Sequence, residues 1–216
     1  MYNFLFYFLM FIIFSMIGWI VEVIYVYIID KDLVNRGYLI GPYIPIYGTC
    51  GVLMVLLLNG LSKYPLLIFI LAMLLCSTIE YLTSYILEKV FNARWWDYSN
   101  QKYNLNGRIC LLNAFLFGVL AIILIYLVNP FVTGILTNLD KKRLEIISLV
   151  CLTIFTTDFI VSTKVAFNLK EKFSSFKSDA TIEIKKLIST TLKNNYLSKR
   201  FYEAFPKYKI TKYKTK

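Results

Sequence analysis

The sequence predicts an all-α fold: a polytopic bundle of about five transmembrane helices, followed by an amphipathic, basic C-terminal tail in the cytoplasm. Three observations lead to this prediction. Hydrophobic residues make up 58% of the 216-residue chain, whereas a soluble domain is roughly 45–50% apolar. The apolar stretches between charges are long enough to cross a bilayer, for which about 20 helical residues suffice. Finally, basic residues concentrate after Lys164.

The expected spans make up a transmembrane domain of residues 1–163, and residues 164–216 make up a partly helical tail. The first span lacks the basic region and small-residue cleavage site of a signal peptide, so we expect it to be retained. The fourth is expected to end near Pro130. The five spans run from about Phe4 to Ile29, Tyr43 to Leu61, Leu66 to Val90, Ile109 to Val128 and Leu144 to Thr163.

The distribution of charge predicts the orientation, because Lys and Arg accumulate on the cytoplasmic side of membrane proteins. The tail carries fourteen Lys and Arg against four Asp and Glu. We therefore expect a plasma-membrane protein, with the tail in the cytoplasm and the N-terminus outside. The loops Asp30–Pro42 and Arg94–Arg108 then share the face of the tail. The basic run Lys141–Arg143 falls on the outer face, against the rule.

Composition excludes several chemistries. The chain has no His, which removes His-based acid–base catalysis and the commonest metal ligand. Its four cysteines stand singly without C-x-x-C spacing, so neither a metal cage nor a disulfide framework is indicated. We expect no metal, no cofactor and, because nothing resembles a recognition fold, no nucleic-acid partner.

Acidic residues within the spans are candidates for function, because charge inside a membrane is costly. Glu80, Ser84 and Glu88 are spaced i, i+4, i+8 and so share one helical face. This face is interpreted either as a site for a cation, a lipid headgroup or a proton, or as an ion-pair clamp with Arg94 or Arg108. The clamp is favoured for Glu88, near the interface, and both interpretations stay open for the deeper Glu80.

Two further acidic residues lie in the first and last spans. Glu22 shares a helix face with Gly18, and a glycine lets a neighbouring helix approach closely, so Glu22 is expected to face a helix partner. The adjacent Trp19 belongs to the same motif. Asp158 is expected to snorkel to the cytoplasmic interface together with Lys164.

The segment from Asn35 to Gly48 is apolar, but its composition cannot hold a regular helix. Irregular backbone at membrane depth needs protein or a water-filled cavity to satisfy it. The segment is therefore either a re-entrant element lining a cavity or an interfacial turn. It contains Arg36, and it is interrupted by Gly37, Gly41, Pro42, Pro45 and Gly48.

A polar and aromatic passage runs from Arg94 to Asn113. Trp95 and Trp96 are typical of the interfacial aromatic belt, and Asn106 lies in an NLNGR turn. The short reach between Arg94, Asp97 and Arg108 favours a self-contained polar knot. Two arginines on one face could also hold an anionic headgroup or phosphate.

The tail has apolar residues at helical spacing, which predicts an amphipathic surface helix. These residues are Ile184, Leu187, Ile188, Leu192 and Tyr196. Attraction to anionic lipid, at about 1 kcal/mol per basic residue near the surface, explains the tail simply. Docking onto a protein partner is the alternative.

Four segments together resemble a bacterial family of small membrane proteins described as ABC-transporter permeases, the CmpB type. They are GWIVEV at 18–23, NRGYLIGPYIPIYG at 35–48, EYLTSYILEKVF at 80–91 and RWWDYSNQKYNLNGRICL at 94–111. The resemblance extends to about Pro130 and implies a multi-span permease that works with a separate ATPase. The sequence contains no G-x-x-x-x-G-K-[ST] motif to bind nucleotide.

The leading hypothesis is a transport protein whose cytoplasmic half gathers the polar residues around a cavity roofed by the Asn35–Gly48 segment. One alternative is a membrane enzyme acting on a lipid or lipid-linked substrate, with a carboxylate as acid or base and Arg as anion clamp. Another is a scaffold or regulator whose tail recruits partners, and a homo-oligomer is left open. The gathered residues are Glu22, Arg36, Glu80, Ser84, Glu88, Arg94, Asp97, Asn106 and Arg108.

Overall fold

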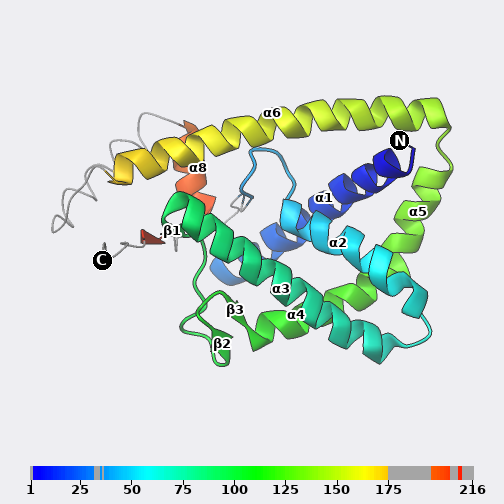
Figure 1. The fold of residues 1–216 in the computed structure, drawn as a ribbon, viewed down its shortest axis with the longest axis horizontal. Helices are drawn as coiled ribbons and strands as arrows, with labels where there is room; N and C mark the ends of the chain where they lie inside the picture. Colours follow the sequence, from blue (N-terminus) through cyan, green and yellow to red (C-terminus); the bar gives the residue numbers. More distant parts are fainter. Residues whose placement is uncertain (1, 32–34, 36, 175–195, 205–208, 211–216) are drawn as a thin grey trace.

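The computed structural model describes residues 2–31, 35, 37–174, 196–204 and 209–210, and the fold is mostly helical (Figure 1). The helices are α1 (Tyr2–Asp30), α2 (Pro45–Leu58), α3 (Pro65–Phe91), α4 (Leu111–Ile123), α5 (Asn129–Thr137), α6 (Lys141–Ser174) and α8 (Tyr196–Ala204). Four two-residue strands, β1 (Ala93–Arg94), β2 (Asn104–Leu105), β3 (Ile109–Cys110) and β4 (Lys209–Ile210), pair antiparallel as β1 with β4 and β2 with β3.

Four stretches are helical, long enough and apolar enough to cross a membrane: Tyr2–Ile28, Pro65–Phe91, Leu111–Thr137 and Lys141–Glu171. The chain is therefore an integral membrane protein. The segment expected to span from Tyr43 to Leu61 is different. Its helix α2 has 14 residues, which rise about 21 Å, less than the ~30 Å of a hydrocarbon core. A 3₁₀ turn, Asn59–Leu61, follows it.

The expectation that the fourth span ends near Pro130 is wrong. The helix continues from α4 through a π-helical turn, Leu124–Val128, into α5. Proline lacks the N–H that an α-helical hydrogen bond needs. Because the π turn ends at Val128, two residues before Pro130, the missing donor falls where α-helical bonding is already interrupted.

The last long helix exceeds its predicted bounds at both ends. α6 begins at Lys141 and continues to Ser174, whereas the sequence predicted a span from Leu144 to Thr163. The boundary expected between a transmembrane domain and a tail therefore falls inside one continuous helix. No Gly or Pro occurs between Lys141 and Ser174 to end it earlier.

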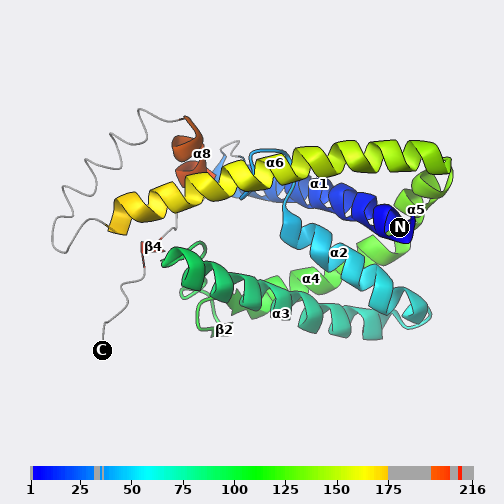
Figure 2. The ribbon, with the colours of Figure 1, turned by 45° about the horizontal axis from the view of Figure 1, so that its top comes forward.

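The helices are arranged with α1 and α2 between α6 on one side and the α3–α4 pair on the other (Figures 1 and 2). One apolar core lies between α2, α3 and α4, around Met54, Ile68 and Ala72. A second core joins α1, α5 and α6. Helices α1 and α2 pack closely at Gly48, because glycine has no side chain to keep them apart. A Cβ at this position would lie 2.5 Å from the carbonyl oxygen of Phe11.

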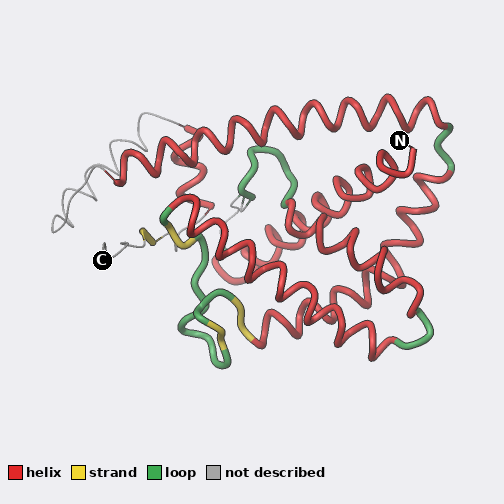
Figure 3. The backbone as a smooth tube through the Cα atoms, viewed as in Figure 1, coloured by secondary structure: helices red, strands yellow, loops and turns green. Residues whose placement is uncertain are grey.

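Loops gather at the two ends of the bundle (Figure 3). Helix α8 and the segment after α3 lie at one end, and the N-terminus and the turn before α6 lie at the other, whereas the segment before α2 reaches the middle of α6. The described parts of the tail are the end of α6 up to Ser174, α8 and β4. The residues Ile184, Leu187, Ile188 and Leu192 of the predicted amphipathic helix lie outside the described residues.

Candidate functional site

The loop before α2 folds back among the helices. The N–H of Ile44 donates to the carbonyl of Ser15 (3.0 Å), which lies midway along α1. Leu39 is fully buried and Tyr43 nearly so. The loop therefore packs among the helices, and a carbonyl of α1 accepts from one of its N–H groups.

Asp158 holds this loop to α6. Its carboxylate accepts hydrogen bonds from the N–H groups of Ile40 (2.9 Å) and Gly41 (2.7 Å) and from the hydroxyls of Tyr43 (2.6 Å) and Ser162 (2.8 Å). The expectation that Asp158 snorkels towards Lys164 is wrong, because the carboxylate finds four donors inside the bundle. It lies near the middle of α6.

The predicted loop residues have distinct roles. The side chain of Asn35 accepts from Trp19 Nε1 (2.8 Å) and from the N–H of Gly37 (3.2 Å), and it donates to the carbonyl of Ile40 (3.1 Å). Through these three hydrogen bonds, Asn35 fixes the fold of the loop from within. At Gly41, a Cβ would collide with the ring of Tyr43.

The irregular segment ends earlier than the sequence suggested. Pro42 is exposed, and Pro45 is the first residue of α2, where a missing N–H costs nothing. Gly48 lies inside that helix, so the expectation of irregular chain up to Gly48 is wrong for its last four residues. Arg36 lies outside the described residues.

At the end of α3, Glu88 binds two arginines; we call these three residues the arginine clamp. Glu88 Oε2 lies 2.8 Å from Arg108 Nη2 and 3.3 Å from Arg94 Nε. Arg108 also donates to Ser84 Oγ (3.3 Å) and lies over the ring of Tyr85. This is the arrangement that the clamp interpretation of Glu88 predicts.

The chain after α3 is tied to this clamp. Arg94 lies 3.8 Å from Asp97 and donates to the carbonyl of Asn106 (3.1 Å). Asn106 has a φ of 53° and Gly107 one of 66°, the left-handed turn expected from NLNGR. A Cβ on Gly107 would lie 2.7 Å from Asp97 Oδ1. The polar knot predicted here is therefore closed largely by its own residues.

The two neighbouring tryptophans have different surroundings. Trp96 Nε1 donates to the carbonyl of Arg108 (3.0 Å). Trp95 is only 3% exposed and packs against Phe91, Ala166 and Leu169. The expectation of an interfacial belt is wrong for Trp95, because the extension of α6 covers it.

Deeper in the bundle lie two carboxylates, Glu22 and Glu80, each bound by a tyrosine; we call these two the carboxylate pair. Tyr47 of α2 donates to Glu22 Oε2 (3.0 Å), and its ring lies against Gly18. Glu22 thus faces a helix partner, as the glycine beside it predicts. Tyr98, from the loop after α3, donates to Glu80 Oε1 (3.1 Å).

Glu80 is the less satisfied of the two. It is 7% exposed, and its Oε2 is buried without a hydrogen-bond partner. Asn113 at the start of α4 and Glu22 of α1 lie close enough to act on its carboxylate. Burial, together with the charge of Glu80, raises the pKa of Tyr98, so its phenol keeps the proton that it donates.

The two glutamates of α3, Glu80 and Glu88, differ in their basic partners: Arg94 and Arg108 both pair with Glu88. Within the described part of the chain, no Lys or Arg forms an ion pair with Glu22 or Glu80. Nor do the described residues include a group of three acidic or Cys side chains able to hold a metal. The residues predicted as one cluster therefore separate into the arginine clamp and the carboxylate pair.

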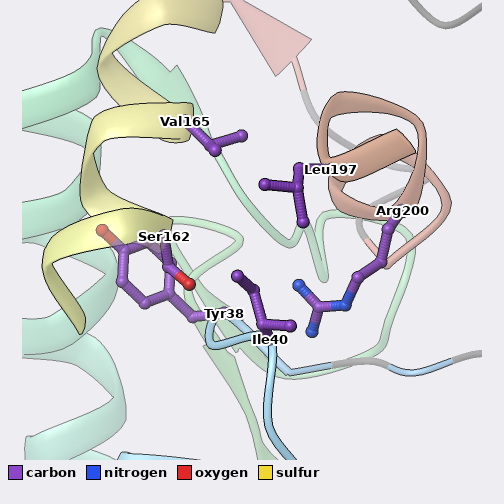
Figure 4. A pocket seen from close by; sticks show the side chains of 6 residues that line it. All are labelled: Tyr38, Ile40, Ser162, Val165, Leu197 and Arg200. Atoms are coloured by element: carbon purple, nitrogen blue, oxygen red, sulfur yellow. The ribbon is translucent and has the colours of Figure 1, made fainter. Parts of the chain in front are cut away.

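Helix α8 packs on the loop before α2. Arg200 donates to the carbonyls of Gly37 (3.1 Å) and Leu39. Figure 4 shows Leu197 and Arg200 facing the loop, beside Val165 of α6. The narrow hollow between them has no room for a water-sized sphere, so it is a packing contact between tail and loop. No pattern in the sequence predicts this contact.

Comparison with known proteins gives one match. Residues 9–163 match the family model described as "Putative ABC-transporter type IV". No curated protein and no solved structure matches the chain. The matched region contains the carboxylate pair, the arginine clamp and Asp158, and it ends before α8.

Proposed function

We propose that the chain, which belongs to the family described as putative ABC-transporter type IV, is a permease-like membrane subunit working with a separate ATPase. The sequence contains no G-x-x-x-x-G-K-[ST] motif, so the energy of ATP hydrolysis would have to come from a partner chain. A bacterial plasma membrane is the proposed location.

The proposed topology has five crossings. α2 is short, but the re-entrant loop precedes it, and the two together connect the two ends of the bundle. The N-terminus then lies outside and the tail inside, because the tail carries a large excess of basic residues. This orientation places both polar loops on the cytoplasmic side, where an ATPase and anionic lipid are available to bind.

The carboxylate pair is the observation that carries the proposal. A buried acidic group in a membrane helix is expensive to maintain and marks a site by default. Here Glu22 and Glu80 lie where α1, α2, α3 and the loop after α3 meet. The arginine clamp and Asp158 hold the two loops in place around them. We assign the pair to the transport site, and the other two groups to its support.

The test begins with the tagged protein purified from its native membranes in mild detergent. We expect an ATPase to co-purify in fixed proportion, and its ATP hydrolysis to fall at least about tenfold in Glu80→Gln at equal complex yield. Asp140→Asn is the matched control, because Asp140 caps α6 at the opposite end and Asn caps helices equally well. Purification without an ATPase, or full activity of Glu80→Gln, would contradict the proposal.

A scaffold function is the second candidate, favoured by the docking of α8 on the re-entrant loop. In that case deletion of residues 165–216 abolishes function, while substitution of Glu80 or Arg108 only destabilises the fold. A lipid-acting enzyme would be recognised by turnover of a headgroup by the purified protein without nucleotide. A homo-oligomer is compatible with each candidate and is measurable by the mass of the purified complex.

A further inference from the structure

We propose that the carboxylate pair binds one singly charged cation, such as an alkali ion or a primary ammonium group, between Glu22 and Glu80. The proposal rests on the transport site assigned above and names the chemistry of what that site takes. It follows from an unsatisfied oxygen, an uncompensated charge and the ligands that surround both.

The unsatisfied oxygen is Oε2 of Glu80. It is buried and has no hydrogen-bond donor, although Oε1 of the same carboxylate is bound by Tyr98. An ionised Oε2 would lack a donor, and a protonated one would lack an acceptor, so either state leaves a buried polar atom without a partner. Such atoms are rare and costly in folded proteins. A ligand at Oε2 removes this cost.

In the part of the chain that the structure describes, no ion pair balances the charge of the carboxylate pair. Glu22 and Glu80 lie within electrostatic range of each other, and like charges in a low-dielectric region repel strongly. Among the described residues, Arg94 and Arg108 are bound at Glu88, on the same face of α3, and no Lys or Arg forms an ion pair with Glu22 or Glu80. Arg108 donates to Ser84, which lies between Glu80 and Glu88 along α3. Its positive charge therefore lies at Glu88 and Ser84 and not at the carboxylate pair.

The surrounding groups favour a hard cation of low charge. Groups that face the pair come from every neighbouring element: Tyr47 and Cys50 of α2, Tyr98 of the loop and Asn113 of α4. Most offer oxygen, the ligand that alkali and ammonium cations share with other hard cations. Calcium sites usually take six to eight oxygens, several of them from carboxylates, whereas this pair supplies two carboxylates and a few neutral oxygens.

The experiment measures cation binding by the purified chain alone. Thermal unfolding is followed in detergent at fixed ionic strength, with NaCl, KCl, LiCl or methylammonium chloride replacing choline chloride. We expect at least one of these cations to raise Tm by about 5 °C at saturation, and the shift to shrink at low pH, where protons compete for the carboxylates. The salts that act distinguish an alkali ion from an ammonium group. Equal Tm in all salts at every pH would overturn the proposal.

Variants locate the binding. Glu80→Gln and Glu22→Gln should each weaken binding of the active cation at least tenfold, and Tyr47→Phe should weaken it several-fold. Asp140→Asn should bind as the wild type does. Wild-type affinity in both glutamine variants would overturn the site. Because no ATPase is present, failure here leaves the proposed partnership intact, and absence of an ATPase from native membranes leaves this binding result intact.

Discussion

The hydroxyl of Tyr43 lies 2.6 Å from Oδ2 of Asp158, and two backbone N–H groups of the same loop bind the same carboxylate. One side chain near the middle of α6 thus replaces the hydrogen bonds that a helix or strand would give the loop. Irregular chain can lie at this depth only because those donors are satisfied. Asp158 is therefore the residue on which the path of the chain into α2 depends.

Replacing Asp158 with Ala should destabilise the protein by about 3 kcal/mol or more, because three loop donors lose their acceptor at about 1–3 kcal/mol each. Asp158→Asn keeps one acceptor oxygen and should cost less. Thermal unfolding in detergent measures both, with Asp140→Asn as the control. An Ala variant as stable as the wild type would show that water replaces the carboxylate.

The arginine clamp should behave as a coupled unit. Glu88 and Arg108 are mostly buried and lie 2.8 Å apart, and removing one partner of such a pair leaves the other charge uncompensated, at a cost of about 3–5 kcal/mol. We expect Glu88→Gln and Arg108→Met each to lower stability, and the double variant to lose about 1–3 kcal/mol less than their sum. Strict additivity in this double-mutant cycle would mean that the contact contributes nothing.

Much of the bundle follows from the sequence, because apolar runs and helical spacing are local properties. The i, i+4, i+8 spacing placed Glu80, Ser84 and Glu88 on one face, and the structure has all three facing the loop after α3. Gly18 indicated a close neighbour for Glu22, and the ring of Tyr47 is that neighbour.

The errors concern contacts between distant residues. Nothing local shows that Asp158 meets Gly41, 117 positions away, so a lone acid near basic residues was assigned to the interface. Trp95 was assigned to the membrane surface because the cover that α6 gives it is invisible in the sequence. Pro130 usually ends a helix, and the π turn before it has no simple sequence signature.

The contact of Arg200 with the loop should hold the tail against the bundle. Its guanidinium donates to two loop carbonyls, which Ala cannot replace. We expect Arg200→Ala to speed chymotryptic cleavage of the tail by about tenfold or more in detergent, since local opening of a docked segment governs its proteolysis. Asp140→Asn, at the opposite end of α6, should change the rate little. Equal rates in the two variants would argue against docking through Arg200.

Gly107 tests the turn that carries Arg108 to the clamp. Its φ of 66° and the closeness of Asp97 leave no space for a side chain, so Gly107→Ala should destabilise the protein by about 1–3 kcal/mol. Gly134 is the matched control. It lies within α5 with nothing within 4 Å of an added Cβ, so Gly134→Ala should be neutral or stabilise by up to about 1 kcal/mol. Equal effects of the two changes, measured by thermal unfolding, would contradict the turn.

The proposed orientation can be tested with single cysteines on a background in which the four native cysteines are replaced by Ser or Ala. A cysteine at Lys216 should resist a membrane-impermeant maleimide added to intact cells and react after permeabilisation, because the basic tail is expected in the cytoplasm. A cysteine at Tyr2, at the start of α1, should react in intact cells if α2 and its re-entrant loop complete a crossing, because five crossings put the N-terminus and the tail on opposite faces. Protection of both positions would instead place the N-terminus on the face of the tail, which requires an even number of crossings. The residues from Asp30 to Tyr64 would then return to the face they left, and the bundle would have four crossings.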